Sequence, residues 1–244
     1  MDLIVEKLVS VIENSRRIVF FGGAGVSTES GIPDFRSTDG LYHQKYDFPP
    51  EEILSYSFFM ENPEEFYRFY RDKMIYQDAI PNMAHRVLKK WELESKISTV
   101  ITQNIDGLHQ AAGSQNVIEL HGSVYRNYCM SCKKSYDLEF MMHEKNVPEC
   151  TECGGIVRPD VVLYEESLDD KILKESVLQI RSADTLIVAG TSLSVYPAAG
   201  LVRNFAGQNL IVINMSPTSL DQSADICIKQ KIGNVLSVFM EENK

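Results

Sequence analysis

Four of the five cysteines occur as two closely spaced pairs, a spacing that is typical of metal sites. Cys129 and Cys132 form the first pair, and Cys150 and Cys153 form the second, which is followed by two glycines. Such pairs place four thiolates around one ion, as in tetrahedral zinc sites. Because four protein ligands leave no open position, we expect one structural zinc ion. Two disulfides or four unrelated cysteines are the alternative, which a reducing compartment disfavours.

A glycine-rich segment, Gly22-Gly23-Ala24-Gly25, directly follows the apolar run at residues 17–21. Backbone N–H groups in such a turn, with the start of the next helix, can bind a pyrophosphate. However, Thr28 occupies the position of the third glycine in the dinucleotide fingerprint, and no acidic residue ends a second strand about twenty residues later. On these residues alone, a tight strand-to-helix turn without a ligand is an equal alternative.

Polar residues also follow the other strand candidates of the chain. Each has an alternative explanation as a helix cap or turn former. Because the carboxyl ends of parallel strands meet at one edge of a sheet, where ligands bind, the whole set predicts a ligand cleft. These residues are Gln103, Asn104 and Asp106 after one strand, His121 after the next, and Gly190, Thr191, Ser192 and Asn214 after two later ones.

The elements that must position these residues alternate between strand and helix patterns. Helical patterns occur in residues 1–17, 83–93 and 169–181, after Pro197, and at the C-terminus. The alternation predicts an α/β fold with a doubly wound, mostly parallel, Rossmann-like sheet. The strand candidates are short apolar runs, as expected for buried parallel strands, at residues 17–21, 97–102, 117–120, 161–164, 184–189, 210–214 and 224–228.

Two segments interrupt this alternation. Residues 36–82 carry many aromatic side chains at helix-like spacing and predict a helical module. Residues 125–159 lose helical and strand periodicity and contain the paired cysteines, so they predict a zinc-binding module. We expect these modules to pack together as one small domain. The Rossmann-like domain would then comprise residues 1–35, 83–124 and 160–244.

Composition limits the classes of partner. The chain has 244 residues, of which 44% are apolar, which is sufficient for a substantial core. A formal net charge of -10 disfavours direct binding of nucleic acid and favours basic protein segments. No window resembles a membrane span, and the N-terminus has the pattern of an amphipathic helix rather than a signal peptide. We therefore expect a cytoplasmic monomer without membrane or nucleic-acid partners.

From about residue 17 to residue 235, the chain resembles the sirtuin, or silent-information-regulator-like, family in its bacterial-type short form. Residues 23–36 are similar to the family's cofactor loop, and residues 102–109 to its second signature. His121-Gly122, the cysteine quartet, residues 190–193 and residues 214–218 follow in the family's order. The resemblance implies an NAD-dependent protein-lysine deacetylase with one structural zinc. Its substrates would be acylated lysine-containing proteins or peptides, and its products nicotinamide, O-acyl-ADP-ribose and free lysine.

The resemblance also implies roles for single residues. His121 would be the general base that activates a ribose hydroxyl, a task suited to an imidazole near neutral pH. Asn104 and Asp106 would complete the catalytic set by positioning ribose, water and the nicotinamide amide. The NAD-binding set would be Ala24, Gly25, Thr28, Phe35, Arg36, Gln103, Ile105, Asp106, His121, Gly190, Thr191, Ser192, Asn214, Met215 and Ile232.

The segment Val161-Val162-Leu163-Tyr164 would bind the substrate peptide as an added strand, with an ordinary core strand as the alternative. Glu165 follows this segment where the family usually has glycine, so it either adopts glycine-like backbone angles or reshapes the loop. Family members that remove succinyl or malonyl groups carry Tyr and Arg three residues apart. This chain has Tyr70 and Lys73, and lysine lacks the planar guanidinium fork. We therefore expect acetyl and similar neutral acyl groups.

Three other functions use the same features. A protein ADP-ribosyltransferase would need the same NAD site with a different nucleophile. A hydride-transferring dehydrogenase would share the sheet, although the variant glycine pattern disfavours it. A non-catalytic NAD-binding interaction module would use the Val161–Tyr164 edge as its partner surface.

Overall fold

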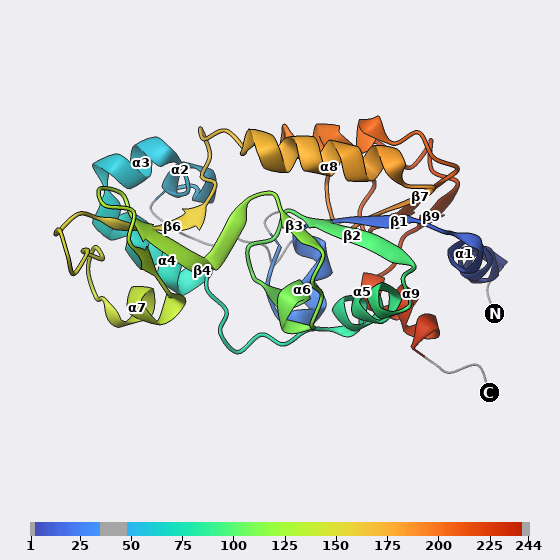
Figure 1. The fold of residues 1–244 in the computed structure, drawn as a ribbon, viewed down its shortest axis with the longest axis horizontal. Helices are drawn as coiled ribbons and strands as arrows, with labels where there is room; N and C mark the ends of the chain where they lie inside the picture. Colours follow the sequence, from blue (N-terminus) through green and yellow to red (C-terminus); the bar gives the residue numbers. More distant parts are fainter. Residues whose placement is uncertain (1–2, 35–47, 241–244) are drawn as a thin grey trace.

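The computed structural model describes residues 3–34 and 48–240, which form a larger and a smaller lobe (Figure 1). The larger lobe contains a six-stranded parallel sheet with strand order β3-β2-β1-β7-β8-β9. This order reverses beside β1, and such a reversal is where open α/β sheets bind ligands. The doubly wound prediction is therefore confirmed. The strands are β1 Ile18–Gly22, β2 Ile97–Thr102, β3 Val117–Glu119, β7 Thr185–Ala189, β8 Asn209–Ile213 and β9 Ile226–Ile228.

Helices cover both faces of this sheet (Figure 1). Alternate residues of β1 face opposite ways: Ile18 and Phe20 pack on one side, and Val19 and Phe21 on the other. Because both faces are covered, the strands are apolar without alternation. Within residues 3–34 and 48–240, no helix is long and apolar enough to cross a membrane. The first face carries α1 Leu3–Asn14, α5 Met83–Leu93 and α9 Ile232–Leu236, and the second carries α8 Asp170–Ser182 and the 3₁₀ helix Ala198–Asn204.

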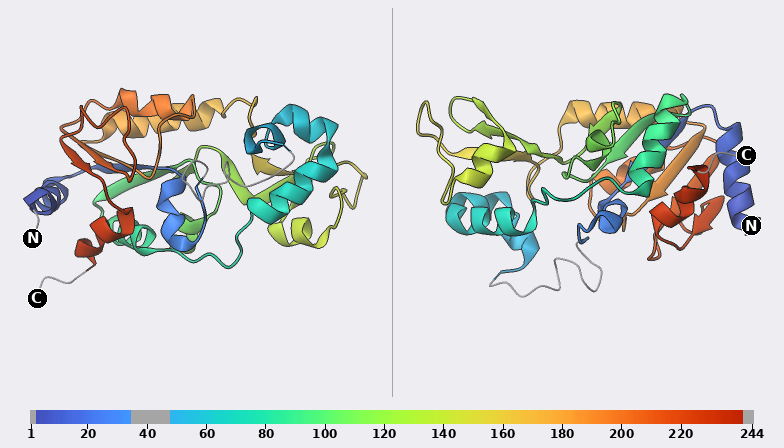
Figure 2. Two further views of the ribbon diagram at one scale, coloured as in Figure 1. Left: turned by 180° about the vertical axis from the view of Figure 1, so that it is seen from behind. Right: turned by 90° about the horizontal axis from the view of Figure 1, so that it is seen from below.

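The smaller lobe joins an antiparallel sheet to a group of helices (Figure 2). The sheet has strand order β5-β4-β6. Residues from both parts share one apolar core, in which Phe59, Phe66 and Tyr67 lie in the same cluster as Val124 and Val157. The elements are α2 Pro50–Ile53, α3 Tyr56–Glu61, α4 Pro63–Lys73, β4 Gly122–Cys129, β5 Ser135–Tyr136, α7 Leu138–His143 and β6 Val157–Val161.

Two predictions about this lobe are wrong. Residues 125–159 were expected to lack periodic structure but contain most of β4 and β6 and all of β5 and α7. The strand expected at Val161–Tyr164 ends at Val161 and pairs with β4 instead of joining the large sheet. A register irregularity in β4 and Pro159 within β6 obscure the two-residue alternation. Proline is tolerated there because β6 is an edge strand.

Candidate active site at the carboxyl edge of the large sheet

A cleft of about 520 Å³ opens at the carboxyl ends of β1, β2, β7 and β8 and extends to the smaller lobe. This volume falls within the usual range of small-molecule sites. Phe35 and Arg36 lie outside the described residues. All other predicted catalytic, NAD-binding and substrate residues line the cleft: Ala24, Gly25, Thr28, Gln103, Asn104, Ile105, Asp106, His121, Val161, Val162, Leu163, Tyr164, Gly190, Thr191, Ser192, Asn214, Met215 and Ile232.

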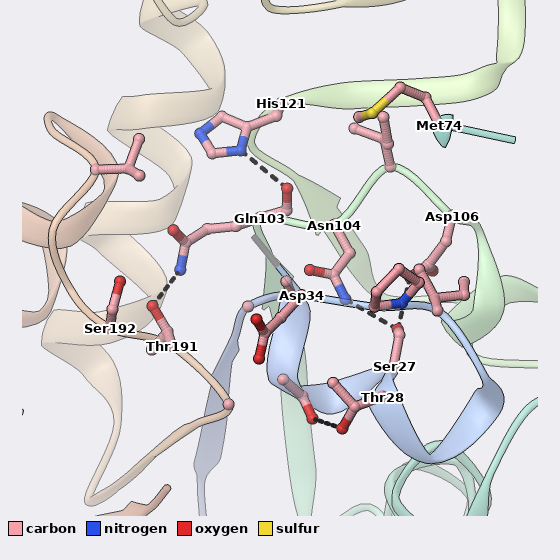
Figure 3. Close-up of a pocket in the computed structure, with 18 of the residues that line it drawn as sticks. Ser27, Thr28, Asp34, Met74, Gln103, Asn104, Asp106, His121, Thr191 and Ser192 are labelled. Carbon is pink, nitrogen blue, oxygen red and sulfur yellow. Dashed lines mark hydrogen bonds between the residues drawn. The ribbon is translucent and has the colours of Figure 1, made fainter. Parts of the chain in front are cut away.

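One end of the cleft contains a hydrogen-bonded group around Asp106 (Figure 3). Ser27 Oγ donates to Asp106 Oδ2 at 2.6 Å, and Asn104 Nδ2 donates to Ser27 Oγ at 3.0 Å. The backbone N–H of Leu108 donates to Asp106 Oδ1 at 2.9 Å. Burial raises the pKa of the Asp106 carboxyl, whereas these hydrogen bonds lower it. The network therefore fixes the orientation of a buried carboxyl group.

Ser27 is a site residue that the sequence analysis did not select. It lies between Ala24 and Thr28, both predicted to bind NAD, and its hydroxyl links the glycine-rich loop to the end of β2. The signal available in the sequence was its position: a hydroxyl side chain within a segment already expected to contact a ligand.

His121 lies in the turn between β3 and β4, with its ring in the cleft (Figure 3). His121 Nδ1 lies 2.9 Å from the carbonyl oxygen of Gln103. Because a carbonyl can only accept, Nδ1 carries the proton, and in the neutral ring Nε2 holds the lone pair. Burial lowers the pKa of His121, although the Gln103 hydrogen bond opposes this effect. The ring is therefore neutral near pH 7 and suited to accept a proton.

The glycine-rich loop packs directly against the end of β7. The N–H of Gly25 donates to the carbonyl of Gly190 at 2.8 Å, so the protein itself uses this donor. A Cβ on Gly25 would lie 2.8 Å from Gly190 Cα, and Gly190 has a φ of 59°. The close approach of the two backbone segments therefore explains why residues 25 and 190 are both glycine. Beside them, Gln103 Nε2 donates to Thr191 Oγ1 at 3.0 Å and joins the ends of β2 and β7.

The predicted substrate segment is held in place by its own N–H groups. Those of Val162, Leu163 and Tyr164 donate to the His121 carbonyl (3.0 Å), a Glu166 carboxylate oxygen (2.8 Å) and the Leu54 carbonyl (2.9 Å). The Val162 carbonyl and the backbone N–H of Glu165 have no partner within residues 3–34 and 48–240. An added peptide strand would therefore pair with these two groups.

A buried ion pair supports this segment. Arg158, which is 5% exposed, donates to both carboxylate oxygens of Glu166, at 2.7 and 2.8 Å. The Arg158 guanidinium also lies over the rings of Tyr56 and Phe59, 5.9 and 5.5 Å from their centroids. These contacts fix the Glu166 carboxylate that accepts the Leu163 N–H.

Changing Glu166 to alanine should destabilise the protein strongly, because it leaves the buried Arg158 charge without a counterion. Loss of one member of a buried pair costs about 3–5 kcal/mol, and each kcal/mol lowers Tm by about 2–4 °C at this chain size. Thermal unfolding measures the change. Arg126→Ala is the control, because the Arg126 side chain is 53% exposed and surface pairs contribute about 0–1 kcal/mol. Equal changes in Tm would contradict the assignment of Arg158 and Glu166 as a buried structural pair.

The four paired cysteines meet in the smaller lobe. Their Sγ atoms all lie within 4.8 Å of one another, and the Cys129–Cys153 and Cys132–Cys150 Sγ distances are 3.5 Å. Disulfides require about 2.05 Å, so that alternative is excluded. Tetrahedral Zn–S bonds of about 2.3 Å imply S–S separations of about 3.8 Å. The Sγ separations of the quartet lie around this value, so the four cysteines fit a zinc ion.

Hydrogen bonds to the cysteine sulfur atoms support this metal site. The Tyr136 hydroxyl donates to Cys150 Sγ at 3.1 Å, and this bond, with backbone N–H groups of Glu152 and Cys153, lowers the pKa of the Cys150 thiol to about 6. The thiolate, which is the form that binds metal, is therefore favoured at neutral pH. The backbone N–H of Cys132 also points at Cys129 Sγ, at 3.4 Å. The fold and the sites thus define an α/β protein with a nucleotide-sized cleft and a Cys₄ lobe.

Comparisons with known proteins agree with this class. Residues 23–197 match the sequence model of the Sir2 family. An NAD-dependent protein deacetylase of Clostridium acetobutylicum is 58% identical over 239 residues, covering 97% of this chain and 98% of the relative. A Clostridium perfringens protein of the same name is 57% identical over 244 residues, covering 99% of this chain and 100% of the relative. The chain belongs to the Sir2, or sirtuin, family.

Solved structures show the same likeness in three dimensions. A structure from work on the mechanism and regulation of Sir2 enzymes has a TM-score of 0.89 and 41% identity, with coverage of 98% of this chain and 97% of that one. A Sir2 variant with deacetylated peptide and 3′-O-acetyl-ADP-ribose has a TM-score of 0.88 and 39% identity, with coverage of 98% of both chains.

Proposed function

We propose that the protein is an NAD-dependent protein-lysine deacetylase. It transfers the acetyl group of an acetylated lysine to the ADP-ribose part of NAD, and it releases nicotinamide and free lysine. The observation that carries this proposal is His121: its Nδ1 is fixed on the Gln103 carbonyl, and its Nε2 is left as the base in a cleft that also holds Asn104 and Asp106. The names of the relatives support the same activity.

The donor set of the cleft fits NAD. Hydroxyl and amide groups suited to ribose and phosphate come from Thr28, Ser192 and Asn214, while Ile105 and Ile232 provide apolar wall. When bound, NAD supplies a ribose carbon that accepts the acyl oxygen as nicotinamide leaves.

The chain's own residues would then divide the work as follows. His121 Nε2 takes a proton from a ribose hydroxyl, and the Gln103 carbonyl holds the ring in the required tautomer. Asp106 and Asn104, fixed through Ser27, orient water and the nicotinamide amide. The Val162 carbonyl accepts from a main-chain N–H of the acylated peptide and positions the substrate. Each role requires a fixed polar group rather than a mobile one.

The activity should decline only on the acidic side of the pH profile, below the ordinary pKa of histidine. Because burial lowers the pKa of His121, kcat/KM should be constant from neutral pH downward and decline only below about 6.5, the ordinary pKa of histidine. The decline reflects protonation of Nε2, which removes the base. Initial rates with saturating NAD between pH 5 and 8 measure it. A limb centred above pH 7 would show that another group is the base.

Changing Asp106 to asparagine should lower activity and raise stability together. Since the folded-state pKa of Asp106 is raised, ionising it costs stability as pH rises from about 3.9 through the folded pKa, and the full cost persists at pH 7. Asparagine removes this cost. We expect a Tm above that of the wild type at pH 7 and a smaller difference near pH 4. A lower Tm at pH 7 would contradict the burial argument.

Acetyl and similar neutral acyl groups are the proposed substrates. Lys73 lines the cleft, but Tyr70 is 1% exposed and stacks on Phe66 in the core of the smaller lobe. The two residues therefore do not form a joint site for an acyl carboxylate. We further propose that the protein acts as a cytoplasmic monomer, without nucleic-acid partners, because reduced thiols suit the zinc site and the chain is acidic.

The test is the stoichiometry of the reaction. An acetyl-lysine peptide and NAD are incubated with the protein, and nicotinamide and peptide are quantified by chromatography and mass spectrometry. The proposal requires one nicotinamide for each acetyl group removed, and neither product without NAD. A peptide that gains the mass of ADP-ribose would identify an ADP-ribosyltransferase, and an unchanged peptide would identify a binding module.

A further inference from the structure

Glu165 combines two unusual features at the edge of the cleft. It follows the predicted substrate segment, lines the cleft, and has a φ of 75°. This left-handed region is sterically unfavourable for a residue that has a Cβ atom. Such a conformation persists only where surrounding contacts enforce it.

The enforcing contacts come from α3. Ser57 N donates to Glu165 Oε2 at 2.9 Å, and Ser57 Oγ donates to Glu165 Oε1 at 2.9 Å. At the preceding residue, the Tyr164 carbonyl accepts from the Tyr56 N–H at 3.0 Å, and the Tyr164 N–H donates to the Leu54 carbonyl. The Glu165 carboxylate is therefore fixed in space rather than sampling many rotamers.

The charge of this carboxylate has no counterion in the part of the chain that the structure describes. The adjacent Glu166 is neutralised by Arg158, but no cation pairs with Glu165 within residues 3–34 and 48–240. Glu165 is also exposed, so approaching side chains can reach it. A fixed, uncompensated anion thus lies directly beside the segment where an acylated peptide would pair.

We propose that Glu165 is a specificity-determining residue that selects substrates with lysine or arginine close to the acylated lysine. This inference rests on the proposed deacetylase function. Side chains at one residue and at two residues from the acyl-lysine lie on opposite faces of an added strand, so only one of these positions faces Glu165. Complementary charge at an exposed site changes binding modestly and weakens with salt.

Peptides that differ at one position test the proposal. An acetyl-lysine peptide carries arginine, glutamine or glutamate at each of the two positions on either side of the acetyl-lysine. The wild type should prefer arginine over glutamate by about two- to fivefold in kcat/KM at one position, mainly through KM, as for an exposed charge pair. Raising the salt to 0.5 M should reduce this ratio.

Variants separate charge from backbone shape. Glu165→Gln keeps the side-chain shape and an acceptor for Ser57 but removes the charge, so the arginine-to-glutamate ratio should fall to about one. Glu165→Asp should retain part of it. Glu139→Gln, which changes net charge equally at an exposed position on α7, should keep the wild-type ratio.

The ratio of kcat/KM for the arginine and glutamate peptides does not depend on overall stability or NAD binding. It therefore isolates recognition of the flanking residue. A wild-type ratio near one at every position, or an unchanged ratio in Glu165→Gln, would overturn the proposal. The glutamine peptides test the underlying activity separately. If the wild type deacetylates none of them with NAD, the proposed function itself is wrong, and the inference falls with it.

Discussion

Replacing His121 with alanine should lower kcat by about 10²- to 10⁴-fold, the usual contribution of a positioned general base. The variant loses Nε2, the atom that accepts the proton. Among the described residues that line the cleft there is no second histidine, so no side chain of similar pKa can replace it. Because the His121 ring makes a single hydrogen bond within residues 3–34 and 48–240, to the Gln103 carbonyl, the fold should survive the change. Initial rates with an acetyl-lysine peptide measure kcat and KM for both substrates.

The matched control is His143→Ala. The His143 side chain is 77% exposed on α7, so its removal should leave kcat within about twofold, as for surface changes. Thermal unfolding of both variants should give values near wild type. A loss in His121→Ala smaller than tenfold would exclude His121 as the base. A large drop in Tm would assign the effect to folding instead.

Removing the metal should have the largest effect on stability. Cys129 and Cys150 are 0% and 4% exposed and belong to the apolar core of the smaller lobe. Each of these two lies 3.5 Å from the Sγ of an exposed cysteine of the quartet, so without an ion neighbouring thiolates would repel one another or take up protons. Structural zinc contributes up to about 10–16 kcal/mol in small domains. We expect a chelator, or Cys150→Ser, to unfold the smaller lobe and abolish activity.

Metal analysis and circular dichroism measure this outcome. The wild type should contain one zinc per chain, and the Cys150→Ser variant should contain none and lose part of its β-structure. Cys227→Ser is the control, because Cys227 lies in β9, away from the quartet, and should retain the full zinc content. A metal-free protein with unchanged Tm and activity would contradict a structural role for the site.

The larger lobe could be predicted because each of its signals is local. Strands buried on both faces give continuous apolar runs, and the bounds of β2 and α5 coincide with the predicted residues 97–102 and 83–93. The site residues gathered because parallel strands bring their carboxyl ends to one edge. His121 and Asn214 therefore line one cleft although they are distant in sequence.

The smaller lobe could not be predicted because its signals are non-local. The pairing of β4 with β6 includes an irregular register, and neither strand shows strict alternation. The Ser57–Glu165 contact joins residues 108 positions apart, and the hydrogen bond from the Tyr67 hydroxyl to the Val157 carbonyl joins residues 90 apart. Such pairs depend on the arrangement of whole elements, so a single sequence contains no direct sign of them.

The most direct measurement of the central claim follows the acetyl group itself. A peptide with ¹³C-labelled acetyl-lysine is mixed with NAD and excess protein for a single turnover, and the products are separated and weighed. Transfer to the ribose predicts that the label appears on ADP-ribose, in an amount equal to the nicotinamide released. Label found as free acetate at the earliest times, with NAD intact, would contradict it and identify a simple hydrolase.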